Sequence, residues 1–303
     1  MQKTLILGTP LRLTKMSFIK IKKKIKKFDK NLTIVGDKSL SIRWALLASQ
    51  SLYKSKSYNL LTSEDVLNTL KCLKKLGVKI NLKKNFCEIC GVGLNGFKYE
   101  KSLSLYAGNS GTLGRLIMGL LVHSKNIIKL KGDKSLSKRD FLRVSKPLTK
   151  FGAKFKTNLG KLPIIIKGTR DPKPINYYET KGSAQCKSAV MLAALNTDGE
   201  TIIKAKKSRD HSELLFKYLN LPIKITKKTN YDLIKIKGKK EIPAINYKIP
   251  SDISSSSFFI VLTALSKNSK LRIKNININP SRTGILSILK MMRVKIKKVN
   301  KRV

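Results

Sequence analysis

Apolar and polar residues along the chain form two kinds of run, which alternate. Three runs are long and almost continuously apolar, as expected of buried helices: 44–52, 116–122 and 189–195. Shorter apolar runs between them, such as 126–130 and 201–204, predict strands. Helices that alternate with strands in this way indicate an α/β fold.

A second set of helices is predicted from polar loops that end in helix-starting residues. Before Val66, the hydroxyl of Ser63 is placed to cap a helix, and Glu64 and Asp65 suit its positive first turn. Each such helix is followed by two more strands. The order of elements is therefore strand, helix, strand, helix, strand, strand.

This order recurs because the chain contains an internal repeat. The pentapeptide Leu-Gly-Val-Lys-Ile begins at Leu76 and has looser copies at Phe151, Leu221 and Met292, so the repeat is about 70 to 77 residues long. The first three copies each precede a short apolar strand that ends in glycine. Each unit thus reads as βαβαββ, and three units are predicted within residues 31–245.

The fourth unit is incomplete. The repeat spacing would place its closing strand and glycine at roughly position 308, past Val303, which we interpret as a truncated or fragmentary reading frame. We therefore expect three parts in the chain: a basic N-terminal extension in residues 1–30, a three-unit substrate-binding domain in residues 31–245, and a partial second domain in residues 246–303.

The composition adds an extreme charge, since 65 Lys and Arg against 17 Asp and Glu give a net charge of +48. Such an excess is the electrostatic footprint of nucleic-acid binding. The basic residues, however, are spread over the whole chain and seldom alternate with aromatic residues, as a coding bias toward Lys, Ile and Asn would produce. We favour the coding bias and expect no nucleic-acid partner, although the positive field favours capture of anionic metabolites.

Cysteine content and hydropathy bear on metal binding and location. Four cysteines do not make a disulfide framework in a chain of 303 residues. Cys87 and Cys90 form a lone C-x-x-C in a strand-like run, where both thiols are expected on one face. Without a second pair or clustered histidines we expect no zinc site. No apolar run reaches transmembrane length and no clean signal peptide is found, so a cytoplasmic location is expected.

One octapeptide, Gly-Asp-Lys-Ser-Leu-Ser-x-Arg, occurs twice, at Gly36–Arg43 and at Gly132–Arg139. Each copy places a lysine, two hydroxyls and an arginine just before a helix-like run. Backbone N–H groups at a helix start, a lysine charge and the planar fork of arginine are the groups that bind phosphate and carboxylate. The two loops therefore predict a ligand, or a pair of ligands, with more than one anionic group.

Together with these loops, four further motifs resemble one family in their order along the chain. They are Asn-x-Gly-Thr-x-x-Arg at 109–115, Ser-Ala-Gln-x-Lys-Ser at 183–188, Ser-Arg-Asp-His at 208–211 and Asn-Pro-Ser-Arg-Thr-Gly at 279–284. From about Leu32 to Lys295 the chain is similar to EPSP synthase, or 3-phosphoshikimate 1-carboxyvinyltransferase, of the enolpyruvyl transferases. The Ser-Ala-Gln and Ser-Leu-Ser-Lys-Arg segments resemble the bacterial class with low glyphosate sensitivity.

The resemblance implies a reaction and an architecture. The reaction is transfer of enolpyruvyl from phosphoenolpyruvate to the 5-hydroxyl of shikimate 3-phosphate, through a tetrahedral adduct and with release of phosphate, in the shikimate pathway of aromatic amino acid biosynthesis. It implies a monomer with no metal and no organic cofactor. It also implies three βαβαββ units per domain in an inverted α/β barrel, with helix N-termini facing a cleft between two domains, of which the second would here be incomplete.

Residue by residue, the resemblance implies two sets of ligand contacts. Shikimate 3-phosphate would be bound by Lys38, Ser39, Arg43, Ser183, Ala184, Gln185 and Arg209. Phosphoenolpyruvate would be bound by Lys38, Gly111, Arg139 and Gln185, with a supporting loop that contains Asn109, Thr112 and Arg115. The residues alone leave a second interpretation open for each position. The cations are equally consistent with solvated surface charges, Arg115 with a brace of its loop, and Lys187 and Ser188 with parts of a helix start.

Several positions depart from the family's pattern. Val35 and Asp140 stand where the family has proline, and after Asp252 the sequence contains no Asp or Glu. The family's proton-transfer carboxylates, and the cations that clamp phosphoenolpyruvate from the second domain, belong to that later region. General acid–base chemistry needs such a titratable group. We therefore expect weak binding of shikimate 3-phosphate with little or no turnover, and leave only Lys38 as a residue that assists catalysis.

Three alternatives remain open. The UDP-N-acetylglucosamine enolpyruvyl transferases share the architecture, but their cysteine-bearing loop and Lys-Asn start motif are not found in this sequence. A basic nucleic-acid-binding protein is motivated by the net charge of +48. A non-catalytic remnant is motivated by the missing carboxylates.

Overall fold

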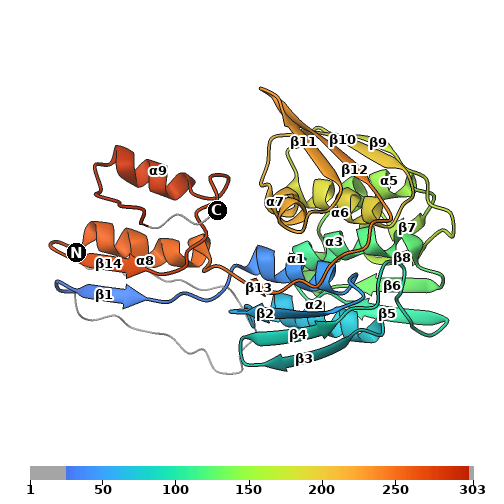
Figure 1. The fold of residues 1–303 in the computed structure, drawn as a ribbon, viewed down its shortest axis with the longest axis horizontal. Helices are drawn as coiled ribbons and strands as arrows, with labels where there is room; N and C mark the ends of the chain where they lie inside the picture. Colours follow the sequence, from blue (N-terminus) through green and yellow to red (C-terminus); the bar gives the residue numbers. More distant parts are fainter. Residues whose placement is uncertain (1–24, 300–303) are drawn as a thin grey trace.

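The structure is a computed structural model that describes residues 25–299 (Figure 1). The predicted basic extension, residues 1–30, therefore lies largely outside the described residues. Its last two residues are part of a strand, β1 (Asp29–Leu32). The described chain forms a larger body of three similar units and a smaller body that combines segments from both ends of the chain.

Three four-stranded sheets with one strand order form the outside of the larger body. The first contains β13 (Tyr247–Lys248), β2 (Lys54–Tyr58), β4 (Phe86–Cys90) and β3 (Lys79–Lys83), in that spatial order. The second contains β5 (Ser102–Tyr106), β6 (Ile127–Lys131), β8 (Lys161–Lys167) and β7 (Lys154–Asn158). The third contains β9 (Asn176–Glu179), β10 (Glu200–Lys206), β12 (Tyr231–Lys237) and β11 (Ile223–Lys227). In each sheet the first two strands are parallel and the other pairs are antiparallel, which confirms the predicted repeat.

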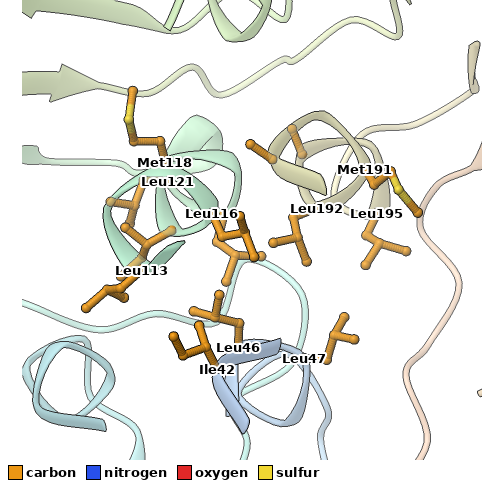
Figure 2. Packing of buried hydrophobic residues seen from close by; sticks show 14 of the residues in the cluster. Ile42, Leu46, Leu47, Leu113, Leu116, Met118, Leu121, Met191, Leu192 and Leu195 are labelled. Atoms are coloured by element: carbon orange, nitrogen blue, oxygen red, sulfur yellow. The ribbon is translucent and has the colours of Figure 1, made fainter. Parts of the chain in front are cut away.

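Three helices, one from each unit, form the centre of the larger body: α1 (Lys38–Ala48), α3 (Gly111–Leu120) and α6 (Ala184–Leu195). Figure 2 shows their apolar side chains meeting, with Leu46, Leu116 and Leu192 coming from the three different helices. Every residue of α1 from Leu40 to Ala48 is buried, as expected of a helix that lies inside a fold. With helices inside and sheets outside, the fold is the predicted inverted α/β barrel.

The second helices of the units cover the first set. They are α2 (Glu64–Lys75), α5 (Leu142–Thr149) with the short α4 (Lys134–Ser137) before it, and α7 (His211–Tyr218); a 3₁₀ turn, η1 (Leu121–His123), follows α3. In α2 the apolar residues Val66, Leu70 and Leu73 recur every three or four positions, and all three are buried. This periodicity is why α2 has one buried face, whereas α1 is buried on all sides.

Helices α3 and α6 approach each other closely at Gly119. A Cβ atom at this position would lie only 2.1 Å from the carbonyl oxygen of Ala189 on α6. Glycine is therefore required here by the close packing of the interior rather than by backbone conformation. Because predicted site residues stand at the starts of α3 and α6, this contact also helps to set the spacing of the site.

Gly119→Ala is expected to lower the free energy of unfolding by about 1–3 kcal/mol, because an overpacked core must shift its backbone or distort its rotamers. Urea-induced unfolding followed by circular dichroism measures the loss. Gly284→Ala is the matched control, since no atom lies within 4 Å of the added methyl group at the start of α9 (Gly284–Met291). Its stability is expected to hold or to rise by up to about 1 kcal/mol. A Gly119→Ala variant as stable as the wild type would contradict the expectation.

The predicted domains exchange strands at their ends. β13, which the sequence boundaries assign to the second domain, pairs with β2 and completes the first sheet. Conversely, β1 lies just before α1 in the sequence but pairs in parallel with β14 (Lys270–Ile273). The prediction that the strand before α1 opens the first unit is therefore wrong, because the hydrogen-bonding partner of that strand lies near the other end of the chain. The limits 31–245 and 246–303 stay a prediction.

The smaller body contains β1, β14 and two helices, α8 (Ile253–Leu265) and α9 (Gly284–Met291). Along α8, Ile253 and Ser256 are buried, whereas Phe258 is 75% and Leu265 is 77% exposed. α8 holds the place in its unit that α1 holds in the larger body, and it is more apolar, since α1 contains Lys38 and Arg43 and α8 contains no charged residue. Within residues 25–299, however, its apolar sides are not covered by neighbouring inner helices.

Two local predictions are wrong. Ser63 is the N-cap residue of α2, with Glu64 and Asp65 in the first turn as predicted, but in the described structure its hydroxyl makes no capping hydrogen bond. Cys87 and Cys90 lie on opposite faces of β4, because residues three apart in a strand point to opposite sides; Cys87 is buried and Cys90 only half-buried.

Across residues 25–299 no group of three or more His, Cys, Asp or Glu side chains is placed to hold a metal ion. No described helix has both the length and the apolar character needed to span a bilayer.

Candidate anion-binding site

The helices that start near the candidate site residues each begin at a polar cap. Five caps accept a hydrogen bond from an N–H group in the first turn: Asp37 for α1 (3.0 Å), Ser110 for α3 (3.2 Å), Asp133 for α4 (2.6 Å), Ser183 for α6 (3.3 Å) and Asp252 for α8 (2.7 Å). A satisfied cap allows the polar residues of the first turn to be helical. The helices therefore begin earlier than the apolar runs predicted, and α1 starts at Lys38 rather than at Trp44.

Gln185, in the first turn of α6, connects the starts of α3 and α6. Its Oε1 accepts a hydrogen bond from Nη1 of Arg115 at 2.6 Å, and its Nε2 donates to Oγ1 of Thr112 at 3.1 Å. Arg115 is 5% exposed and lies over the Phe141 ring, 5.2 Å from the ring centroid. Burial, followed by the positive charge of Arg143, lowers the pKa of Arg115. Arg115 is thus a buried brace that orients Gln185.

Gly111 is the point where two guanidinium groups meet the start of α3. A Cβ atom at Gly111 would lie 2.9 Å from Nη1 of Arg115 and 3.2 Å from Nη1 of Arg139. The Arg139 side chain is exposed and donates a hydrogen bond from Nη2 to Oδ1 of Asn109 at 2.8 Å. The structure therefore joins Asn109, Gly111, Thr112, Arg115, Arg139 and Gln185 in one network; of the residues assigned to phosphoenolpyruvate, Lys38 is the one outside it.

Lys38 stands at the start of α1, between the larger and the smaller body. Its Nζ is 3.0 Å from a carboxylate oxygen of Asp65, and its backbone N–H donates to Asp252 at 3.3 Å. The lysine side chain is 48% exposed, so this ion pair is open to solvent and weakly held. An anionic ligand would therefore compete with Asp65 for the ammonium group at little cost.

Arg43, by contrast, is buried and held by three hydrogen bonds from the protein. Its Nε donates to Oγ of Ser212 at 2.8 Å, its Nη2 to Oγ of Ser188 at 3.2 Å, and its Nη1 to the carbonyl oxygen of Ser39 at 3.1 Å. These bonds use three of the five N–H groups of the guanidinium and leave one on each Nη. Burial lowers the pKa of Arg43 to about 10, and the carboxylates of Glu213 and Asp37 oppose this shift. Arg43 is thus a buried cation that has two further N–H groups for hydrogen bonds to a ligand.

The remaining predicted residues stand on two neighbouring loops. Ser183 caps α6 and Ala184 is its first residue, so their backbone lies at the positive end of that helix. Arg209 lies in the loop before α7 and is exposed as a residue, but partial burial of its guanidinium, followed by the charge of Arg282, lowers its pKa. A cleft of about 420 Å³ lies between this loop, the β11–β12 hairpin and Pro280.

Sequence reasoning missed two ion pairs near these residues. Arg282 is 3.5 Å from Asp252, across the start of α8. Lys187 pairs with Glu213 in the interior, where their side chains are 0% and 4% exposed. The signal in the sequence was a lysine inside an apolar helical run that has no carboxylate three or four residues away, since buried lysines require a partner.

His211, the first residue of α7, is a buried neutral base. Burial lowers its pKa to about 3, and the positive charges of Arg43, Arg282 and Arg209 act in the same direction, against Asp210. The unfolded chain therefore binds a proton on this residue at a higher pH than the folded chain does. As a consequence, acid favours unfolding.

Stability is accordingly expected to fall as the pH drops from 6.5, the ordinary pKa of histidine, toward about 3. The contribution of His211 to the loss between pH 7 and pH 4 is about 3 kcal/mol. Urea unfolding of the wild type and of His211→Gln across this range measures it, and the variant is expected to have the flatter pH profile. Parallel profiles would show that the fold accommodates a protonated His211.

The repeated βαβαββ units, with helices inside and sheets outside, place this chain in the class of inverted α/β-barrel proteins. Within that class the chain belongs to the EPSP synthase family: the family model for EPSP synthase (3-phosphoshikimate 1-carboxyvinyltransferase) matches residues 22–303. This result agrees with the motifs in the sequence and does not favour the UDP-N-acetylglucosamine enolpyruvyl transferases.

Relatives named 3-phosphoshikimate 1-carboxyvinyltransferase support the assignment. The protein of Vesicomyosocius okutanii is 44% identical over 86% of this chain and 59% of its own length. That of Petrotoga mobilis is 42% identical over 89% of this chain and 63% of its own length. The structure of EPSP synthase from Acinetobacter baumannii matches with a TM-score of 0.84 at 35% identity, over 92% of this chain and 62% of that one. The chain thus spans about 60% of the length of the relatives that it matches.

Proposed function

We propose that the chain binds shikimate 3-phosphate and phosphoenolpyruvate for the transfer of enolpyruvyl from phosphoenolpyruvate to the 5-hydroxyl of shikimate 3-phosphate. The observation that carries the proposal is the network in which Gln185 joins α3 to α6 and Gly111 lies against two guanidinium groups. Such an arrangement of backbone N–H groups, a planar amide and arginines suits a small phosphorylated carboxylate. A monomer in the cytoplasm is part of the same proposal.

The shikimate 3-phosphate half of the site would combine α1 and α6. Arg43 would offer the N–H groups that the protein leaves free, as a fork to the phosphate. Lys38 would leave Asp65 and contribute charge, and the hydroxyl of Ser39 would donate beside it. From α6, Ser183, Ala184 and Gln185 would supply the positive helix start, and Arg209 would close the loop side.

The phosphoenolpyruvate half would be built on α3. The absence of a side chain at Gly111 lets the substrate approach the backbone, where a Cβ would lie 2.9 Å from the Arg115 guanidinium and 3.2 Å from that of Arg139. Arg139 would exchange its hydrogen bond with Asn109 for one with the ligand. Thr112 and Arg115 would hold Gln185 in place, and Lys38 would reach phosphoenolpyruvate from α1.

Proton transfer needs a carboxylate without a partner, and most carboxylates near the site already have a cation or a hydrogen-bond donor beside them. Asp252 pairs with Arg282 and Glu213 with Lys187, and only Asp65 would be released, when Lys38 leaves it for a ligand. Asp37 accepts a hydrogen bond from Asn277 at 3.1 Å, and Asp210 accepts one from Asn279 at 2.8 Å. A carboxylate whose oxygens already accept hydrogen bonds or pair with a cation is not free to exchange a proton with a substrate within hydrogen-bond reach. We therefore propose binding with little turnover for these 303 residues on their own.

Titration calorimetry with shikimate 3-phosphate, together with an assay of phosphate release in the presence of both substrates, tests the proposal. We expect saturable binding and almost no phosphate release. Absence of saturable binding would contradict the proposed site, and turnover comparable to that of a complete enzyme would contradict the statement on proton transfer. Tight RNA binding at physiological salt that shikimate 3-phosphate does not affect would instead favour the nucleic-acid alternative.

A further inference from the structure

A second polar layer lies beneath Arg43 and joins α6 to α7. Lys187 and Ser188 are consecutive on α6, and Ser212 and Glu213 are consecutive on α7. Lys187 pairs with Glu213, and the hydroxyls of Ser188 and Ser212 are 2.7 Å apart. Both contacts connect the same turns of the two helices.

Arg43, on α1, rests on this layer. Its Nε and Nη2 donate to the Ser212 and Ser188 hydroxyls, which belong to different helices. The orientation of the guanidinium therefore depends on the spacing between α6 and α7. The ion pair between the residue before Ser188 and the residue after Ser212 fixes that spacing.

The charges of Lys187, Glu213 and Arg43 also make the state of Arg43 depend on the ion pair. Lys187 and Arg43 are both buried cations, and Glu213 is the carboxylate that offsets the cost of burying Arg43, ahead of Asp37. Burial raises the pKa of Glu213, and the Lys187 ammonium opposes this rise. Glu213 is therefore the carboxylate that partly neutralises two buried cations, Lys187 and Arg43.

Stability alone does not explain this pair. A buried ion pair is often no more stable than well-packed apolar residues of similar volume, since desolvation cancels most of the attraction. The pair lies, however, below three proposed phosphate contacts: Arg43 itself, the Ser183–Gln185 start of α6, and Arg209 in the loop that precedes α7. Locking α6 to α7 fixes all three relative to one another.

We propose that Lys187 and Glu213 are positioning residues, which hold α6 and α7 in register so that Ser188 and Ser212 present Arg43 to a phosphate group. This inference rests on the proposed function for its ligand, shikimate 3-phosphate. The geometry of Arg43 itself is measurable without any ligand.

The test replaces the pair by apolar residues of similar size, in the double variant Lys187→Met/Glu213→Leu. We expect its melting temperature to stay within about 5 °C of the wild type. Binding of shikimate 3-phosphate, followed by calorimetry, is expected to weaken at least about tenfold. In ¹⁵N-arginine spectra, the Nε–H signal of Arg43, assigned by its absence from Arg43→Lys, is expected to exchange with water at least about tenfold faster.

Lys235→Met/Glu200→Leu is the matched control, because it removes an exposed pair (3.3 Å) between β10 and β12; neither readout should change. If the double variant does not fold, Glu213→Asp keeps the charge and shortens its reach by one methylene, and the same two losses are expected in smaller size. A folded variant with unchanged binding and unchanged Arg43 exchange would overturn the inference. A wild type that binds no shikimate 3-phosphate, alongside faster Arg43 exchange in the variant, would overturn the proposed function and leave this inference standing.

Discussion

Replacing Arg43 by lysine is expected to weaken the binding of shikimate 3-phosphate at least about 100-fold, a loss of about 3 kcal/mol. Lysine is a point charge with three N–H groups and cannot satisfy both serine hydroxyls and a phosphate as a planar fork does. The site of Arg43 is also 5% exposed, so an ammonium group there would lack the water that normally solvates it. Titration calorimetry on both proteins measures the effect, with thermal unfolding to confirm that the variant is folded.

Arg139→Lys is the matched control for this experiment. Arg139 is exposed and belongs to the network around Gly111 rather than to the layer beneath α1. In the absence of phosphoenolpyruvate, its replacement is expected to change the binding of shikimate 3-phosphate by less than about threefold. Equal losses from the two substitutions would mean that general positive charge, rather than the fork of Arg43, attracts the ligand.

The repeat made most of the fold predictable. A motif that recurs with its following glycine reveals the units, and the long apolar runs reveal the three inner helices, because such runs have no polar face to place in water. The exchange of β1 and β13 was not predictable in this way. Period-two alternation identifies a strand but carries no information about its partner, and both strands pair far from their sequence neighbours.

In the candidate site, too, local patterns were predictable and contacts between distant segments were not. The loops with Lys38, Gly111 and Arg139 could be found because small residues and cations before an apolar run are a local pattern. The sequence indicates that Lys187 needs a partner but not that the partner is Glu213, since the two residues lie on different helices and only the packing of α6 against α7 brings them together. The error on Cys87 and Cys90 was of another kind, because the strand period by itself places residues three apart on opposite faces.

Glu213→Gln is expected to lower the free energy of unfolding by about 3–5 kcal/mol, which is a large part of the stability of a typical domain. The reason is that Lys187, whose side chain is 0% exposed, would be left buried without a carboxylate beside it. Glutamine has nearly the same shape as glutamate, so the loss reports on charge rather than on packing. Urea unfolding of both proteins at neutral pH measures it.

Glu200→Gln provides the comparison, since Glu200 is 49% exposed and pairs with the half-exposed Lys235. Water replaces the lost partner there, so the expected loss is below about 1 kcal/mol. The double variant Lys187→Met/Glu213→Leu is expected to recover most of the stability that Glu213→Gln loses, because it removes both charges together. If Glu213→Gln were as stable as Glu200→Gln, Lys187 would have to reach another anion or water. Glu213 would then not be the residue that makes a buried cation next to Arg43 possible.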